Sequence, residues 1–398
     1  MRILLMSLVI LVGAESAVLF IPSAQTKKKE SPFVTILRAH ADKILQTCAT
    51  TRYRPACYDE EIPKLMDAVS MEDAFEVTRL VQDRDTAYTY CHVLGHALSA
   101  HETAKDPDMW KEVITRCPRG LCSNGCIHGA FQERFRAETL TGEQIDAVKP
   151  EFVEVCEEKP NWRPTGLEQA TCYHALGHLL MYVSGADTEK SVALCEEIGI
   201  KSKSGGRFTP LCFDGVFMQI FQPLEPDDFA LIKGKEVTRE IHPAFCKPYT
   251  GIRLSSCWNE GWPLYREQII RPDGLVKFCT NALLPADFHD ACYQDLFYVI
   301  TAQLQFDETR LRDFCNRLPR GVMPLCFANV SSRMIETDWR NTKRAADFCS
   351  SAKDDASKNR CFQELLNYST YNFHQGSAEF LALCDSLPGA WRAQCLGR

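Results

Sequence analysis

The chain lacks the excess of positive charge that binding to nucleic acid favours. Its 45 Lys and Arg residues are outnumbered by 52 Asp and Glu residues, which gives a formal net charge of −7. A surface that binds nucleic acid releases counterions from phosphates and is usually basic, so we expect no nucleic-acid partner. The apolar content of 45% is ordinary for a folded protein.

Common catalytic signatures are also missing. The sequence holds no Cys-x-x-Cys-His haem-attachment motif, no phosphate-binding glycine loop, no Gly-x-Ser-x-Gly elbow and no His-Glu-x-x-His zinc-protease motif. No complete catalytic set can therefore be named. The sequence leaves enzymatic activity open and favours a role without catalysis.

Long apolar runs are confined to the N-terminus. A mainly apolar run covers residues 3–20 and is followed by small residues that could be cleaved. Residues 1–24 are therefore predicted to be a secretory signal peptide or an uncleaved anchor, with a buried core helix as the alternative. Residues 25–47 are expected to form a linker and a first helix. Membrane contact is expected only through the N-terminal segment.

Twenty cysteines recur with a regular period. One set precedes an aromatic or other apolar residue, with neighbours 34 to 46 residues apart. Such a period is typical of arrays of helix-turn-helix repeats. We therefore expect an all-α fold, an α-solenoid of about nine disulfide-stapled repeats. It would form a single elongated domain over residues 48–398, with histidine-rich repeats at 85–185 and C-terminal repeats at 186–398.

A second set of cysteines ends the helical pattern just upstream of each member of the first set. In an exported chain the simplest solution is local pairing, repeated in every unit. The predicted bridges are Cys48–Cys57, Cys156–Cys172, Cys195–Cys212, Cys246–Cys257, Cys279–Cys292, Cys315–Cys326, Cys349–Cys361 and Cys384–Cys395. Repeat analogy adds Cys117–Cys126 and leaves Cys91–Cys122. The alternative for this region is a small zinc site made by Cys117, Cys122, Cys126 and His128.

The stretch Cys172-Tyr-His-Ala-Leu-Gly-His-Leu-Leu-Met-Tyr-Val-Ser-Gly185, followed by Lys190-Ser-Val-Ala-Leu-Cys195, resembles the SEL-like, tetratricopeptide-related repeat family. It is most similar to the cysteine-rich secreted members of that family. The resemblance implies an α-solenoid with one disulfide per repeat and a protein-binding role. The Leu-Gly signature is clear at Leu94-Gly95 and Leu176-Gly177, whereas the later repeats match in cysteine placement.

Polar residues follow the first set of cysteines by two positions, or by one position in the second repeat. This column consists of Asp59, His92, His128, His174, Asp214, Asn259, Gln294, Ala328 and Gln363. In a tetratricopeptide-like stack it would lie on the concave surface. We therefore predict a binding groove that contains His92, His128, His174, Asp214 and Asn259, with Trp258 and Trp262 as aromatic neighbours.

Two histidine pairs have the i,i+4 spacing that places both rings on one helix face. They are His92 with His96 and His174 with His178. That spacing suits two imidazoles on one transition-metal ion such as zinc, copper, nickel or iron. His128 is placed to complete either site. One ion on all five rings is not expected, because the pairs are two helices apart. Histidines that only pack at tight helix contacts, or that act as acid–base groups, are the alternatives.

Two functions follow from these patterns. The first is an extracytoplasmic scaffold, secreted or anchored, that binds a protein or peptide in the predicted groove. The second is a metal-binding protein or metal-dependent enzyme with its histidine cluster on the repeats between residues 91 and 182.

Overall fold

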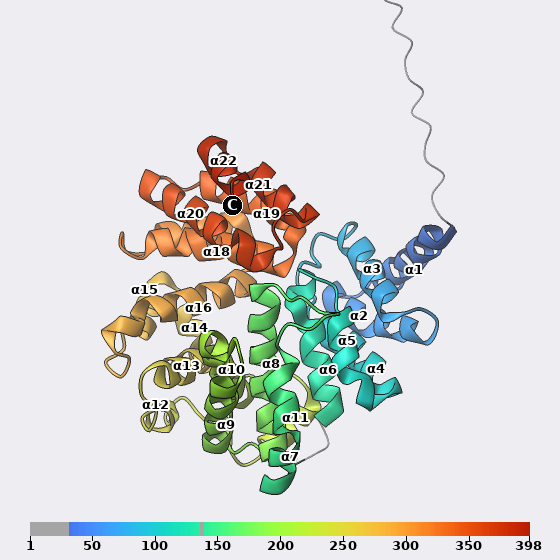
Figure 1. Ribbon diagram of the computed structural model, residues 1–398. Coiled ribbons are helices and arrows are strands. Elements are labelled where there is room, and N and C mark those ends of the chain that lie inside the picture. The colour runs from blue at the N-terminus through green and yellow to red at the C-terminus, as the bar shows by residue number, and fades with distance from the viewer. Residues whose placement is uncertain (1–31, 136–138) are drawn as a thin grey trace, which may run out of the picture.

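The computed structural model describes residues 32–135 and 139–398, and this part of the chain is helical throughout (Figure 1). It contains 22 α-helices and no β-strand. The predicted signal peptide or anchor at residues 1–24 lies outside the described residues. None of the helices in the described part of the chain is long and apolar enough to cross a membrane.

Eight helices follow one another as an inner row, each packed against the next in chain order. They are α4 (His92–Lys105), α6 (Gly125–Phe135), α8 (Gly166–Ser184), α10 (Gly205–Phe221), α13 (Ile252–Glu260), α16 (His289–Gln303), α18 (Met323–Thr337) and α20 (Asp355–Asn372). Every one of them contributes side chains to the wall of a single cavity of about 740 Å³.

A second set of helices alternates with the inner row along the chain. It consists of α5 (Trp110–Arg116), α7 (Gly142–Val155), α9 (Thr188–Lys201), α12 (His242–Cys246), α15 (Pro272–Cys279), α17 (Glu308–Asn316), α19 (Thr342–Ser350) and α21 (Ala378–Ser386). The remaining helices are α1 (Pro32–Cys48), α2 (Arg54–Glu61), α3 (Met71–Gln82), α11 (Pro226–Leu231), α14 (Arg266–Ile269) and α22 (Gly389–Leu396). Buried apolar residues form two clusters, one from Leu37 to Cys257 and one from Trp258 to Cys395.

Local sequence fixes the ends of the long helix α8. The Thr165 hydroxyl accepts from the Glu168 backbone N–H at 3.1 Å, and the Glu168 carboxylate accepts from the Thr165 N–H at 2.6 Å. This reciprocal pair satisfies two of the backbone donors that every helix start leaves unpaired. Gly185 ends the helix with φ of +66°, a left-handed conformation that glycine adopts without a steric cost.

Ten disulfides join the cysteines in the pairs predicted from the repeat, and no cysteine of the described residues is free. The alternative zinc site at Cys117, Cys122 and Cys126 is therefore wrong, because these sulfurs are bonded to other cysteines. Loops of this length give on the order of 3 kcal/mol per bridge in the chain-entropy model. So many disulfides indicate an oxidising, extracytoplasmic environment.

The two ends of the helix array meet, so the described chain does not form the open, elongated array expected from the cysteine period. Helix α18 contacts the short turn Cys122–Asn124, and α20 contacts α8. The Trp339 N–H donates to the Gly120 carbonyl at 3.2 Å. Figure 1 shows the C-terminal helices beside the N-terminal half of the molecule.

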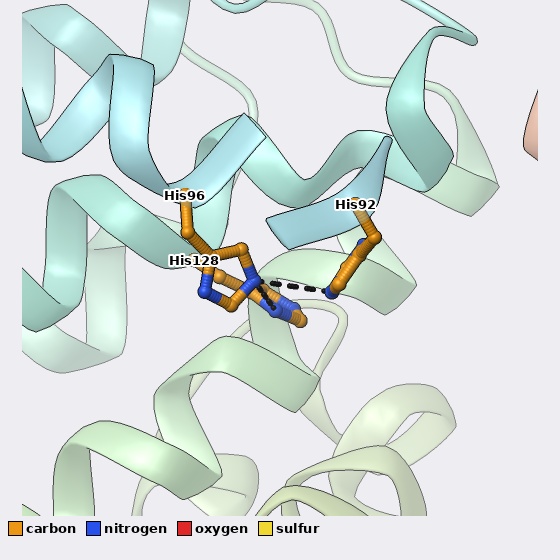
Figure 2. A group of neighbouring side chains, drawn as sticks. All are labelled: His92, His96 and His128. Atoms are coloured by element: carbon orange, nitrogen blue, oxygen red, sulfur yellow. Dashed lines mark hydrogen bonds between the residues drawn. The ribbon is translucent and has the colours of Figure 1, made fainter. Parts of the chain in front are cut away.

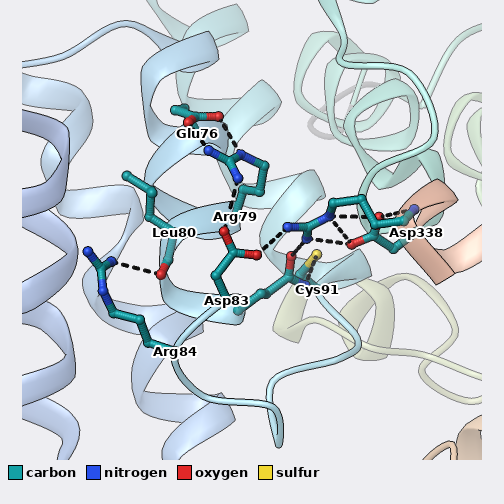
Figure 3. Close-up of polar contacts among 9 residues, drawn as sticks. Glu76, Arg79, Leu80, Asp83, Arg84, Cys91 and Asp338 are labelled. Atoms are coloured by element: carbon teal, nitrogen blue, oxygen red, sulfur yellow. Dashed lines mark hydrogen bonds and ion pairs between the residues drawn. The ribbon is translucent and has the colours of Figure 1, made fainter. Parts of the chain in front are cut away.

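Charged side chains form part of the contact between the two ends of the helix array. Arg340 places Nη1 at 2.5 Å from Asp83 Oδ1, and its Nε lies 2.9 Å from Asp338 Oδ2. Asp83 also accepts from Arg79 at 2.9 Å (Figure 3). Elsewhere in this contact, the Arg207 guanidinium lies 5.4 Å from the centre of the Tyr371 ring. Contacts between side chains remote in sequence therefore hold the two ends of the helix array together.

Peptide mapping without reduction tests the framework. We expect ten intramolecular bridges with the pairings above, because nine of the pairs each close one helix-to-helix connection and Cys91–Cys122 ties the start of α4 to the turn before α6. Bridges between distant repeats, or several free thiols, would contradict the fold and the oxidising compartment together.

Candidate metal centre

Backbone contact between α4 and α6 brings three histidines together. A Cβ atom added at Gly129 would lie 2.1 Å from the His96 carbonyl oxygen, and one at Gly125 would lie 2.2 Å from that of His92. Real Cβ atoms do not come this close, so only glycine permits the approach. The His128 ring is carried on the same helix as these glycines, and it therefore faces His92 and His96.

Helices α8 and α10 meet in the same way. A Cβ at Gly215 would lie 2.0 Å from the His174 carbonyl oxygen, and one at Gly177 would lie 2.1 Å from the Cys212 carbonyl oxygen. The glycine that precedes His178 is therefore needed for helix packing. This explains the Leu-Gly-His sequence on α8 in physical terms.

The rings of His92, His96 and His128 meet through their nitrogens (Figure 2). His96 Nε2 lies 3.1 Å from His92 Nε2 and 3.1 Å from His128 Nδ1. One nitrogen from each ring lies within 4.8 Å of the other two, and each residue is at most 8% exposed. Tetrahedral zinc with bonds of about 2.0–2.1 Å separates its ligand nitrogens by about 3.3 Å. The triad could therefore hold a metal ion with little movement.

Oxygen acceptors surround the opposite nitrogens of the first pair. His92 Nδ1 lies 3.3 Å from the Cys122 carbonyl oxygen. His96 makes a hydrogen bond to the Gln132 side chain, and its Nδ1 lies 4.0 Å from Glu225 Oε1. The Cys122 carbonyl assigns the His92 ring proton to Nδ1 and leaves its Nε2 as a lone pair, and the nearby Glu225 carboxylate favours the same tautomer of His96. Metal-binding histidines in proteins are held by outer-shell acceptors of this kind.

The Cys122 carbonyl is aimed at His92 by an unusual turn. Cys122, Ser123 and Asn124 have φ values of 51°, 50° and 56°, the left-handed region that residues with a Cβ rarely adopt. Each such residue costs of order 1–3 kcal/mol unless its surroundings compensate. The bridge from Cys122 to Cys91, which directly precedes His92, ties this turn to the start of α4.

The second histidine pair is built in the same way. His174 Nε2 and His178 Nε2 are 3.2 Å apart, and His178 Nδ1 lies 2.6 Å from Gln219 Oε1. The Gln219 amide donates to Asp228 at 2.7 Å, so its oxygen is turned towards the ring. Asp228 is fixed in turn by the Tyr182 hydroxyl and by two backbone N–H donors.

All five rings form one cluster around His128. Its ring centre lies 4.9 Å from that of His92, 5.0 Å from His96, 5.3 Å from His174 and 5.6 Å from His178. Although the two pairs lie two helices apart in the inner row, His128 on the helix between them lies next to both pairs.

Burial makes all five imidazoles neutral. Burial, followed by repulsion from His178, lowers the pKa of His96 to about 3. Burial is also the largest cause for the other four rings and lowers the pKa of His92, His128, His174 and His178. Neutral imidazole is the form that coordinates metals, so the cluster needs no deprotonation before an ion binds.

Most of the predicted groove residues line the large cavity. His92, His128, His174, Asp214, Asn259 and Trp262 all lie on its wall. Trp258 does not, and its placement in the groove is wrong. Its indole is 2% exposed, stacks on His242 and donates to the Phe278 carbonyl at 3.2 Å, so it belongs to the core.

The wall also carries acidic residues that the sequence did not single out. Burial, followed by repulsion from Asp295, raises the pKa of Asp214 to about 8. Burial raises the pKa of Asp295 to about 6, while the Asn259 amide donates to its carboxylate at 2.6 Å. Burial, followed by repulsion from Asp214, also raises the pKa of Glu260 well above its usual value. At neutral pH the raised pKa values keep Asp214 and Glu260 protonated, so these two groups present hydrogen-bond donors to the cavity, whereas Asp295 is mainly ionised.

Arg333 is a further wall residue that no sequence pattern marked. It is 1% exposed, and its guanidinium carbon lies 3.0 Å from the centre of the Tyr298 ring. Its Nε and Nη2 have no hydrogen-bond partner among the described residues. The same guanidinium lies 5.7 Å from the Tyr90 ring, which stacks on His92. A buried cation therefore stands next to the histidine cluster.

The glycine contact can be tested by replacing Gly129 with Ala. The new methyl group would overlap the His96 carbonyl oxygen. We therefore expect the free energy of unfolding to fall by about 1–3 kcal/mol, the usual effect of overpacking. Thermal unfolding of the two proteins measures it. Gly142→Ala is the matched control, because a Cβ there meets nothing within 4 Å. Equal melting temperatures for all three proteins would argue against the tight contact.

The acidic wall predicts a dependence of stability on pH. Because the pKa of Asp214 rises from 3.8 to about 8 in the fold, the folded state binds a proton that the unfolded state releases. The stabilisation is complete below about pH 4 and disappears as the pH rises towards 8. In metal-free protein, the melting temperature of the wild type should fall relative to that of Asp214→Asn between pH 5 and 8. The buried histidines, whose lowered pKa values act in the opposite direction below about pH 7, contribute equally to both proteins. An identical slope in the variant would contradict this assignment.

Comparisons of the chain with protein-family models, with curated protein sequences and with solved structures find no match. The resemblance to SEL-like repeats therefore stays a prediction. The function has to be argued from the chemistry of the site.

Proposed function

We propose that this is an extracytoplasmic metal-binding protein, in which His92, His96 and His128 hold a transition-metal ion. The observation that carries the proposal is the meeting of three neutral imidazoles at nitrogen–nitrogen distances of 3.1 Å. The ordered acceptors on the far side of the first two rings support it further.

A cluster of histidines held only by hydrogen bonds accounts less well for this arrangement. A hydrogen bond between His92 Nε2 and His96 Nε2 needs a proton on one of them. That proton would leave a bare Nδ1 facing an oxygen, the Cys122 carbonyl at 3.3 Å in one case and the Glu225 carboxylate at 4.0 Å in the other. With both protons on Nδ1, two lone pairs face each other at 3.1 Å in a site shielded from water. A cation between them removes that repulsion.

The donor set narrows the choice of ion. Three imidazole nitrogens suit zinc, copper, nickel or iron and do not suit calcium or magnesium, which prefer oxygen ligands. Three protein ligands also leave a coordination position open, as in catalytic zinc sites. His92 and His128 line the large cavity, so a molecule there would reach an ion on the triad. Metal-dependent catalysis on a small molecule is therefore the activity we favour.

The protein- or peptide-binding role remains a second candidate, and one observation favours it. The polar column, from His92 to Asn259, lies along one wall of a cavity of about 740 Å³. A space of this size suits a short peptide segment or a small molecule. Loss of peptide binding in Asn259→Ala with unchanged metal content would favour this second role.

Metal analysis of the purified protein tests the proposal. After preparation without chelators and loading with Zn²⁺, we expect tightly bound zinc that survives dialysis. In His92→Ala/His96→Ala the affinity should fall by more than the 10- to 100-fold that outer-shell changes cause. His101→Ala is the control, since His101 lies on α4 but is 40% exposed and outside the cluster. Wild-type protein that retains no metal would overturn the proposal.

A further inference from the structure

The pair formed by His174 and His178 is not used by the triad, although its rings are held in the same manner. Their Nε2 atoms are 3.2 Å apart. Gln219 accepts from His178 Nδ1 at 2.6 Å, and the His174 ring makes a hydrogen bond to the Leu211 backbone. The His178 proton is therefore assigned to Nδ1, and the Nε2 lone pair of His178 faces His174.

His128 connects this pair to the triad. Its Nδ1 faces His96, whereas its Nε2 is buried and has no hydrogen-bond partner among the described residues. The ring is nearly parallel to that of His174, at 5.3 Å and 20°, and lies 5.6 Å from His178. To bind an ion through each nitrogen, His128 would release its one ring proton to solvent when the second ion binds, so the shared ring would be an imidazolate.

Negative charge lies just behind the pair. Burial acts to raise the pKa of Asp228, but hydrogen bonds from Tyr182, Glu225 N–H and Gln219 outweigh it and keep the carboxyl ionised. A cavity of about 20 Å³, room for one water-sized ligand, is bordered by His128, His178 and Asp228. A carboxylate next to a histidine ligand partly offsets the charge of a bound cation.

We propose that His174 and His178 hold a second metal ion, with the His128 ring between it and the first, so that the protein carries a two-ion centre. This rests on the proposed function, because the first ion occupies the triad. It deepens that function by placing two Lewis-acidic ions side by side at the edge of the large cavity.

Zinc stoichiometry measured by elemental analysis is the first test. We expect two ions per chain in the wild type and one in His174→Ala/His178→Ala. Gln219→Leu keeps both ligands but removes the acceptor that holds the His178 proton on Nδ1. The affinity for the second ion should therefore fall by 10- to 100-fold, and the affinity for the first ion should stay unchanged. His101→Ala should retain two ions, and His174→Gln/His178→Gln replaces the alanine variant if that variant does not fold.

Electron paramagnetic resonance of the Cu²⁺-loaded protein tests the shared ring. Two copper ions joined through His128 should be magnetically coupled, so the signal of an isolated Cu²⁺ should be weak. In His174→Ala/His178→Ala the isolated signal should return, with one copper per chain. Two uncoupled copper signals in the wild type would overturn the shared role of His128.

The outcomes separate the two proposals. One ion in the wild type that persists in His174→Ala/His178→Ala would overturn the second site and leave the proposed function standing. One ion that is lost in that variant would show a single site spread over both pairs and would also overturn the two-ion centre. No ion in the wild type would overturn both proposals.

Discussion

Direct backbone contact between helices is the constraint on which the candidate centre depends. Packed helices usually lie 8–10 Å apart, and at that spacing histidines on neighbouring helices need not touch. Gly129 admits the His96 carbonyl of α4, and Gly215 admits the His174 carbonyl of α8. The carbonyls of the histidine-bearing helices thus lie where a Cβ would otherwise be. The meeting of His92, His96 and His128 is a consequence of the contact between α4 and α6, and that contact is possible because glycines stand at positions 125 and 129.

The rest of the molecule is stabilised by disulfides and by contacts between segments that are remote in sequence. The disulfides are local and secure each helix-to-helix connection, so they do not decide how the array curves. Its closure depends on contacts between remote segments, among them Arg340 with Asp83 and Tyr371 with Arg207. Closure turns one face of the inner helices into a cavity wall. The histidine centre therefore lies beside a partly open cavity, whose volume suits a small molecule or a short peptide segment.

The sequence predicted whatever depends on short-range spacing. The cysteine period determined the pairings, and the i,i+4 spacing placed each histidine pair on one helix face. It could not predict the closed array, because contacts such as Arg340 with Asp83 have no local signature. Trp258 was misplaced since it precedes Asn259 by one residue, which rotates it about 100° around the helix and into the core. Gln219 lies outside any motif, and only the fold brings it to His178.

The central claim is that neutral imidazoles from several helices converge to bind a metal ion. X-ray absorption at the zinc edge of the loaded protein tests it most directly, because it reports the ligands of the ion itself. The account predicts a shell of nitrogen ligands at about 2.0–2.1 Å with the outer scattering of imidazole rings. A shell made only of oxygen from water and carboxylates, without imidazole scattering, would contradict it.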